Sequence, residues 1–240
     1  MLIGGLQKLS LLDYPGRPAA VIFTVGCNFH CGFCHNPELV KSQTPPVGRP
    51  CLPADRSQIL EKDIFDFLKS RQGLLEGVVI TGGEPTIQPD IVGFVKKIKE
   101  LGFLVKLDTN GFIPAIVERL VKDKLVDFWA MDIKAPMEKY ADVTGRAIDF
   151  DLIKKSIEII ISSGADYEFR STVVSGLHSS EDILDMAWSV KGAKKFVLQQ
   201  FVSRDKLVDK SFVGRQSLNK TELEKLARQC EHWVEKCEIR

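Results

Sequence analysis

The stretch TVGCNFHCGFCHNPEL runs from Thr24 to Leu39. It places three cysteines within eight positions, namely Cys27, Cys31 and Cys34. The apolar run Ala20–Val25 overlaps its start and has the composition of a buried parallel strand. The first cysteine therefore follows the carboxyl end of a strand, where α/β proteins place their active sites. The spacing and the position together indicate a metal centre in an α/β fold.

Apolar runs alternate with amphipathic stretches of helical period along the rest of the chain. Five further strands are expected at Gly77–Gly82, Phe103–Thr109, Val126–Ile133, Tyr167–Val174 and Lys195–Phe201. Helices are expected at Gln58–Ser70, Asp90–Leu101, Ile113–Lys122, Asp151–Ser163 and Ser180–Lys191. Because a helix follows each strand, the pattern predicts an α/β fold with parallel strands and right-handed crossovers.

The chain has 240 residues, of which 44% are hydrophobic, so it can bury a substantial core. We expect a single domain over residues 1–240, with a core at about 18–202 and a C-terminal helix at about 220–236. The segment Gln43–Pro53 contains four prolines, which lack the N–H that helices and central strands need. It is expected to be a loop beside the cysteines, where it could help to dock a partner.

Lys and Arg number 33 against 32 for Asp and Glu, so the net charge is +1. Binding to nucleic acid or to a membrane through a field of one sign is not predicted. No signal segment is recognisable, and no run approaches the roughly 18 apolar residues of a membrane span. We expect a cytoplasmic protein, whose six cysteines stay reduced and favour metal or redox chemistry over disulfides. Three of them lack a cysteine at ligand spacing and are not expected to be ligands: Cys51, Cys230 and Cys237.

Three thiolates leave a metal centre one ligand short. Four ligands close a structural zinc site, and four thiolates close an ordinary iron–sulfur cluster. If the three cysteines hold a four-iron cluster, one iron stays open for a substrate or cofactor. The alternative is a Cys3His zinc site that includes His30 or His35, although both lie so close to the cysteines that tetrahedral geometry is tight. Iron is favoured on this ground, and zinc remains open.

Three further motifs follow the next strands: TGGEP (Thr81–Pro85), LDTNG (Leu107–Gly111) and MDIK (Met131–Lys134). Paired glycines expose backbone groups that a small ligand can approach closely. Asp108, Thr109 and Asp132 supply hard oxygen ligands at neighbouring strand ends. Taken one at a time, these residues are explained better as helix caps or as members of surface ion pairs. Their position at one rim of the same predicted sheet indicates an active site.

These motifs resemble those of the radical S-adenosylmethionine (SAM) enzymes. The resemblance rests on the C-x3-C-x2-C spacing, on Phe33 before the last cysteine, and on GGEP after the second strand. LDTNG and MDIK narrow it to the activating enzymes of glycyl radical proteins. The opening LQKLSLLDYPG and the stretch GCNFHCGFCHNPELV are most similar to the activating protein of anaerobic ribonucleoside-triphosphate reductase. The resemblance extends from about Leu6 to Val202.

The resemblance implies a partial (β/α)6 barrel that holds a [4Fe–4S] cluster and SAM. In such enzymes the cluster reductively cleaves SAM to a 5′-deoxyadenosyl radical. This radical would abstract a hydrogen atom from a glycine of a partner protein. The implied partners are a glycyl radical enzyme, in particular anaerobic ribonucleoside-triphosphate reductase, and a flavodoxin or ferredoxin-like reductant.

The resemblance also implies roles for individual residues. Cys27, Cys31 and Cys34 would be the catalytic cluster ligands. The implied SAM-binding residues are Phe33, Gly82, Gly83, Glu84, Asp132, Lys134, Arg170 and Gln199. A monovalent cation site is implied at Asp108, Thr109, Met131 and Asp132. The sequence LQQF departs from the pyruvate formate-lyase activating enzyme, which has a histidine near this strand end, because Gln199 or Gln200 can hydrogen-bond a ribose but cannot titrate.

Three alternative functions stay open at this point. One is an activating enzyme of pyruvate formate-lyase or of another glycyl radical enzyme. A second is a radical SAM enzyme with a small-molecule substrate, which would need convergent polar groups beyond those that hold the cofactor. The third is a zinc-stabilised binding module, which iron and sulfide in about a four-to-four ratio would exclude.

Overall fold

The computed structural model describes residues 1–40 and 59–240. Cys51 and the proline-rich segment Gln43–Pro53 lie outside these residues. The chain divides into two compact units. The first unit comprises Met1–Asn28, Glu38–Thr109 and Ala115–Trp129, and the second comprises Phe29–Pro37, Asn110–Pro114 and Ala130–Arg240. The expectation of one domain over residues 1–240 stays a prediction.

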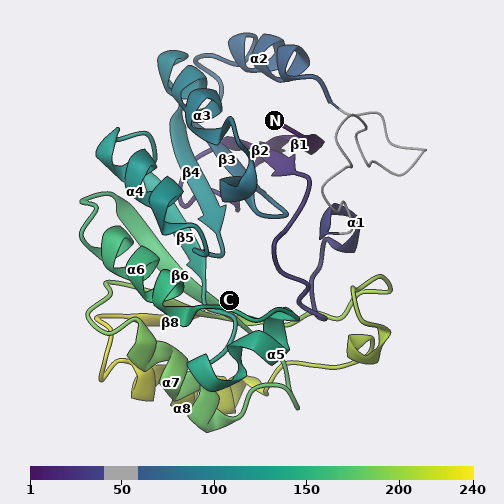
Figure 1. Cartoon of the computed structure of the whole chain (residues 1–240), viewed down its shortest axis with the longest axis vertical. Helices are drawn as coiled ribbons and strands as arrows, with labels where there is room; N and C mark the ends of the chain where they lie inside the picture. The colour runs from purple at the N-terminus through teal and green to yellow at the C-terminus, as the bar shows by residue number, and fades with distance from the viewer. Residues whose placement is uncertain (41–58) are drawn as a thin grey trace. The chain divides into compact units, whose positions relative to one another are not determined.

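The first unit is built on four strands (Figure 1): β1 (Ile3–Ser10), β2 (Ala19–Thr24), β3 (Gly77–Gly82) and β4 (Leu104–Thr109). The strands β2, β3 and β4 are parallel and adjacent, and β1 pairs with β2 in the antiparallel direction. Most side chains of β2 and β3 are buried, which agrees with their continuous apolar composition. The carboxyl ends of the three parallel strands therefore share one edge.

Helices precede or follow the parallel strands of the first unit: α1 (Pro37–Val40), α2 (Glu61–Lys69), α3 (Ile91–Glu100) and α4 (Pro114–Lys122). A 3-10 turn, η1 (Pro85–Ile87), follows β3. Helix α3 buries Ile91, Phe94 and Ile98, while Lys96 and Lys97 are exposed. This spacing puts one apolar face of the helix into the core.

The second unit contains the end of β5 (Phe128–Asp132) and three further strands: β6 (Asp166–Val173), β7 (Phe196–Gln200) and β8 (Cys237–Ile239). The strands β6, β7 and β8 are parallel and adjacent. Its helices are α5 (Tyr140–Thr144), α6 (Phe150–Ile161), α7 (Ser180–Ser189) and α8 (Lys220–Cys230), with 3-10 turns η2 (Met137–Lys139) and η3 (Lys210–Phe212). Figure 1 shows α6, α7 and α8 as the principal helices of this unit.

The six predicted parallel strands and the five predicted crossover helices are all confirmed, with small changes at their ends. The edge strand β1 was missed because it exposes Gln7, Lys8 and Leu9 and so lacks a continuous apolar run. The C-terminal helix begins at Lys220 as predicted. Its predicted extent to about residue 236 was wrong, because the helix ends at Cys230.

Tertiary hydrogen bonds explain why α8 ends early. The Gly192 N–H donates to the Trp233 carbonyl oxygen at 2.8 Å, and the Glu235 N–H donates to the Ala193 carbonyl oxygen at 2.9 Å. These bonds hold the chain after Cys230 against the turn before β7 and direct it into β8. Local helix preference is overridden by such pairing. None of the helices among the described residues combines the length and the apolar character needed to cross a membrane.

Candidate active site

The first unit brings several of the predicted site residues to one edge of its sheet. Cys27 follows β2, the GGEP turn follows β3, and Asp108 and Thr109 end β4. Because these strands are parallel, their carboxyl ends lie together. The sequence prediction that these motifs share one edge is therefore confirmed within this unit.

The GGEP turn packs tightly against the backbone that leads to Cys27. The Gly83 N–H donates to the Thr24 carbonyl oxygen at 2.9 Å, and the Glu84 N–H donates to the Gly26 carbonyl oxygen at 2.8 Å. A Cβ atom on Gly83 would lie 1.9 Å from the Gly26 oxygen, and Gly82 has a φ angle of +115°. Glycine is thus required here for close backbone approach. Contact of the turn with SAM stays a prediction.

We expect Gly83→Ala to destabilise the protein by about 3 kcal/mol, because backbone atoms rather than a flexible side chain would have to move. The free energy of unfolding in urea measures this change. The matched control is Gly93→Ala in α3, where an added Cβ meets nothing within 4 Å and should stabilise the helix by up to about 1 kcal/mol. A loss below about 0.5 kcal/mol for Gly83→Ala would contradict the tight contact.

Glu84 connects the ends of β3 and β4. Its carboxylate oxygen Oε1 accepts hydrogen bonds from Thr86 N at 3.0 Å, from Thr86 Oγ1 at 2.6 Å and from Thr109 Oγ1 at 2.7 Å. The side chain is almost fully buried, and charge-assisted bonds of this kind are strong. Glu84 thus holds the two strand ends together, and its proposed contact with SAM stays a prediction.

The predicted cation ligands of the first unit have protein partners in this structure. The Asp108 carboxylate is paired with the Lys106 ammonium, and the Thr109 hydroxyl donates to Glu84. In the second unit the Met131 side chain is buried, and its Cε atom lies 2.0 Å from the position that a Cβ on Gly111 would take. The cation site implied for these residues stays a prediction.

The second unit holds the other two cysteines in a hydrogen-bonded loop. The Cys34 N–H donates to the Cys31 carbonyl oxygen at 3.1 Å, and the Asn36 N–H donates to Cys34 Sγ at 3.5 Å. The His30 N–H donates to the Thr144 carbonyl oxygen of α5 at 2.7 Å. Burial raises the pKa of the Cys31 thiol to about 11, and the nearby Lys134 ammonium acts in the opposite direction. Bound iron would supply the positive charge that keeps this thiolate ionised.

The histidines near the cysteines are engaged elsewhere or exposed. The His35 ring stacks on Phe201 with centroids 5.4 Å apart, and its Nε2 lies 2.9 Å from the Val202 carbonyl oxygen. His30 is exposed. Within residues 1–40 and 59–240, no three His, Cys, Asp or Glu side chains converge as ligands of one metal ion. The finding includes the three cysteines of the described residues, so it favours neither iron nor zinc.

Phe33 lies in an aromatic cluster of the second unit. Its ring centroid is 6.2 Å from that of His178, 6.5 Å from that of Phe201 and 6.1 Å from that of Phe212. The segment with Phe212 also covers Gly32, because the Asp209 N–H donates to the Gly32 carbonyl oxygen at 3.0 Å. The cysteine loop is therefore held by residues that follow β6 and β7 and by the 3-10 turn η3. Stacking of Phe33 on the SAM adenine stays a prediction.

Asp132, Lys134 and Arg170 form an ion cluster that joins the end of β5 to the middle of β6. Asp132 Oδ1 is 2.9 Å from Arg170 Nε, and Asp132 Oδ2 is 2.9 Å from Lys134 Nζ. Burial alone would raise the pKa of Asp132, but the two cations outweigh it and lower the pKa to about 2. Burial likewise opposes the charge of Lys134, but Asp132 holds the Lys134 pKa above its ordinary value. All three groups are charged at neutral pH. Their contact with SAM stays a prediction.

Gln199 lies on β7 opposite Thr172 of β6 and is partly exposed. The structure thus places it near the carboxyl edge of the second unit, and its contact with the SAM ribose stays a prediction.

His178 is a buried residue of this site that the sequence analysis missed. The Val174 N–H donates to His178 Nδ1 at 3.2 Å, so the ring proton is on Nε2, which donates to the Lys134 carbonyl oxygen at 3.0 Å. Burial lowers the pKa of His178, which keeps the ring neutral. The residue connects the ends of β5 and β6 to Phe33. Its position directly after the predicted strand Tyr167–Val174 was the available signal.

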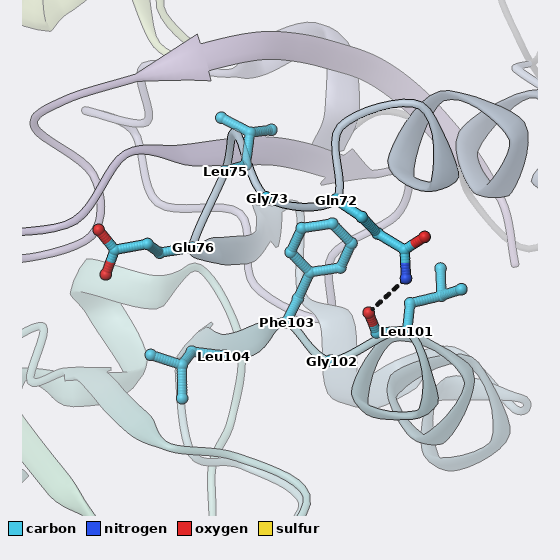
Figure 2. Close-up of a pocket in the computed structure, with 8 residues that line it drawn as sticks. All are labelled: Gln72, Gly73, Leu75, Glu76, Leu101, Gly102, Phe103 and Leu104. Atoms are coloured by element: carbon cyan, nitrogen blue, oxygen red, sulfur yellow. Dashed lines mark hydrogen bonds between the residues drawn. The ribbon is translucent and has the colours of Figure 1, made fainter.

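A separate cavity of about 320 Å³ lies at the opposite edge of the first unit (Figure 2). It is lined by the turns before β3 and β4, where the Gln72 side chain donates to the Leu101 carbonyl oxygen at 2.8 Å. The Phe103 ring faces this space, and none of the lining residues is a predicted site residue. The cavity is not part of the candidate active site.

The first unit places the turn at Gly82 and Gly83 against the backbone that leads to Cys27. The second unit holds the cysteine loop and the ion cluster of Asp132, Lys134 and Arg170. The family model described as the Radical SAM superfamily matches residues 21–187 of this chain. The chain therefore belongs to the radical SAM superfamily, whose cofactors are a [4Fe–4S] cluster and SAM.

Two curated relatives define the enzyme class more closely. The "Putative glycyl-radical enzyme activating enzyme" of Methanocaldococcus jannaschii is 34% identical over 247 residues, which cover 100% of this chain and 95% of the relative. The pyruvate formate-lyase-activating enzyme of Clostridium pasteurianum is 30% identical over 197 residues, 80% of this chain and 77% of that protein. The expected class, a radical SAM enzyme of the activating type, is confirmed.

A solved structure supports the fold. Streptococcus suis SuiB bound to S-adenosylmethionine has a TM-score of 0.66 and 18% identity, over 92% of this chain and 49% of that chain. Together with the family match, this similarity confirms the predicted α/β fold, a partial barrel of the radical SAM type with parallel strands.

Observations in each unit fit the two cofactors. None of the described cysteines is in a disulfide, so the thiol chemistry of the cysteine loop suits iron. In the first unit, the turn at Gly82 and Gly83 leaves no room for a Cβ against Thr24 and Gly26, and both glycines are partly exposed. In the second unit, the buried Tyr140 hydroxyl lacks an acceptor among the described residues, which is expected where a group has yet to bind.

Proposed function

We propose that this protein generates a glycyl radical on a partner enzyme. The observation that carries the proposal is the 34% identity to an activating enzyme over 100% of this chain. When bound, the cluster and SAM together supply a 5′-deoxyadenosyl radical that can abstract a hydrogen atom. The chain itself must hold these groups, orient them and exclude water.

The geometry of the second unit supports specific roles. As the resemblance implies, Cys27, Cys31 and Cys34 would hold three irons of the cluster. The Arg170 guanidinium would pair with the SAM carboxylate, for which its forked donors are suited. Asp132, already hydrogen-bonded to Arg170 and Lys134, would fix the direction of both cations. The fourth iron would then be left to the amino-acid end of SAM.

The finer features of the proposal follow from the resemblance described above. The partner would be anaerobic ribonucleoside-triphosphate reductase, and the electron would come from a flavodoxin or a ferredoxin-like protein in the cytoplasm. Residues 1–240 would act as one catalytic domain. Pyruvate formate-lyase and other glycyl radical enzymes are the alternative partners.

We expect the reconstituted protein to convert SAM to 5′-deoxyadenosine when a reductant is added without air. With the correct partner, electron paramagnetic resonance (EPR) should show a glycyl radical in proportion to the nucleoside formed. The control is the same partner with its radical glycine changed to alanine, which should give no such signal. Formation of 5′-deoxyadenosine without a radical on any candidate partner would contradict the proposal and favour a small-molecule substrate.

A further inference from the structure

Tyr140, the first residue of α5, carries a buried hydroxyl that has no acceptor among the described residues. The side chain is 1% exposed. A buried hydroxyl without a partner costs about 1–3 kcal/mol. By contrast, the buried Tyr167 hydroxyl of the same unit accepts a hydrogen bond from the Lys194 N–H at 3.1 Å. The Tyr140 hydroxyl therefore requires an explanation.

The Tyr140 ring is fixed against the cysteine loop. It packs edge-to-face on Phe29 at 6.2 Å and on Phe150 at 5.2 Å between centroids. The Thr144 hydroxyl donates to the Tyr140 carbonyl oxygen at 2.7 Å, and the His30 N–H donates to the Thr144 carbonyl oxygen at 2.7 Å. Phe29 and His30 are the two residues before Cys31. The loop and α5 thus form one packed piece, in which the phenol cannot turn to solvent.

Charged groups of the site act on the pKa of this phenol. Burial is the main cause that raises the pKa of Tyr140 above its ordinary value, and the Lys134 ammonium and a backbone contact with Lys134 oppose it. Cys31 and Asp132 also raise the pKa. The hydroxyl is therefore protonated at neutral pH and is available as a hydrogen-bond donor next to the cysteine loop.

We propose that the Tyr140 hydroxyl donates a hydrogen bond to a sulfur atom of the [4Fe–4S] cluster, either the Cys31 thiolate or an adjacent sulfide. Hydrogen bonds to the sulfurs are among the factors that set cluster potentials. The reduced cluster carries one more negative charge than the oxidised cluster, so the donor stabilises the reduced form more. Tyr140 thus raises the reduction potential and makes the cluster easier to reduce. The inference requires only that the chain binds the [4Fe–4S] cluster of its superfamily, and it does not depend on which partner enzyme is activated.

The test is the variant Tyr140→Phe, which keeps the ring contacts with Phe29 and Phe150. We expect a full cluster whose reduction potential, measured by EPR-monitored titration without SAM, is more negative. At a fixed applied potential, loss of one such bond should lower the ratio of reduced to oxidised cluster about fivefold. For a one-electron couple, in which a tenfold change corresponds to 59 mV, this is a shift of the reduction potential by about 40 mV. The matched control is Tyr167→Phe, which removes a buried phenol at the amino end of β6 and should leave the potential unchanged.

A second variant keeps the proposal testable if Tyr140→Phe fails to hold a cluster. Replacement of Tyr140 by 3-fluorotyrosine makes the hydroxyl a stronger donor and should shift the potential in the positive direction. An unchanged potential in either variant with a full cluster would overturn the proposal. A weaker SAM affinity at unchanged potential would also overturn it, because the hydroxyl would then serve SAM rather than the cluster.

Discussion

Loss of any one cysteine of the loop should remove the cluster. We expect the iron content after anaerobic reconstitution to fall from about four irons per chain to nearly none in each of the variants Cys27→Ala, Cys31→Ala and Cys34→Ala. The reason is that the two remaining thiolates cannot hold the four-iron cluster. Cleavage of SAM should be lost with the cluster. Iron and sulfide analysis measures the first effect, and the yield of 5′-deoxyadenosine measures the second.

The matched controls are Cys230→Ala and Cys237→Ala. Both residues are buried in the second unit, on α8 and β8, and so test the loss of a buried thiol of the same kind. They should keep a full cluster and full turnover. We expect the same of Cys51→Ala, although Cys51 lies outside the described residues. A full cluster in any variant of the cysteine loop would refute the assignment of that cysteine as a ligand.

The second large effect is expected for Asp132→Ala. Its carboxylate holds Arg170 and Lys134, so its removal leaves two partly buried cations without this partner. We expect the affinity for SAM to fall at least tenfold, which is about 1.4 kcal/mol, while the cluster stays intact. Calorimetric titration of the reconstituted protein with SAM measures the change. An unchanged affinity would mean that Asp132 only stabilises the strand end.

Asp127→Ala is the control that separates ligand binding from stability. Asp127 pairs with Lys99 at 2.6 Å and accepts from the Val105 N–H at 2.7 Å, at the amino end of β4 in the first unit. Both variants lose an aspartate that holds a strand end through an ion pair. Only Asp132→Ala should lose SAM affinity, whereas both should lower the free energy of unfolding.

The ion pairs of Asp132 with Lys134 and Arg170 also predict how the stability of the protein depends on pH. The pKa of Asp132 is about 2 in the folded protein, below the ordinary value near 3.9. The contribution of Asp132 to the free energy of unfolding is therefore fully present above about pH 4. This contribution is lost as the pH falls through the folded pKa. The difference in unfolding free energy between the wild type and Asp132→Ala should therefore be about 2 kcal/mol near neutral pH and should shrink below pH 4. Denaturant titrations at several pH values measure it.

Much of the fold was predictable because its strands are buried and its helices have one apolar face. The run Gly77–Gly82 was predicted with the bounds that the structure has, since each residue of a central parallel strand contacts apolar neighbours on both faces. Other features, among them the strands β1 and β8 and the end of α8, were missed for the opposite reason. The strand β1 is an edge strand with exposed polar residues, and α8 is ended by hydrogen bonds to a distant turn.

The sequence by itself predicted the chemistry of the site, with iron favoured over zinc. The spacing of Cys27, Cys31 and Cys34 fits an iron–sulfur cluster with an open iron, and the alternation of strands and helices puts the GGEP, LDTNG and MDIK motifs at carboxyl ends. These conclusions need only local pattern, because parallel strands present their carboxyl ends at one edge.

Only the tertiary structure decided which side chains meet within each unit. The contact of Asp132 with Arg170, the bond from His178 to the Lys134 carbonyl oxygen, and the packing of Tyr140 beside Phe29 all join segments far apart in the chain. Such contacts depend on how the strand ends and the loops after them are positioned in space. A single sequence carries no local signal for that placement, since the same residues at a strand end also suit a cap or a surface ion pair.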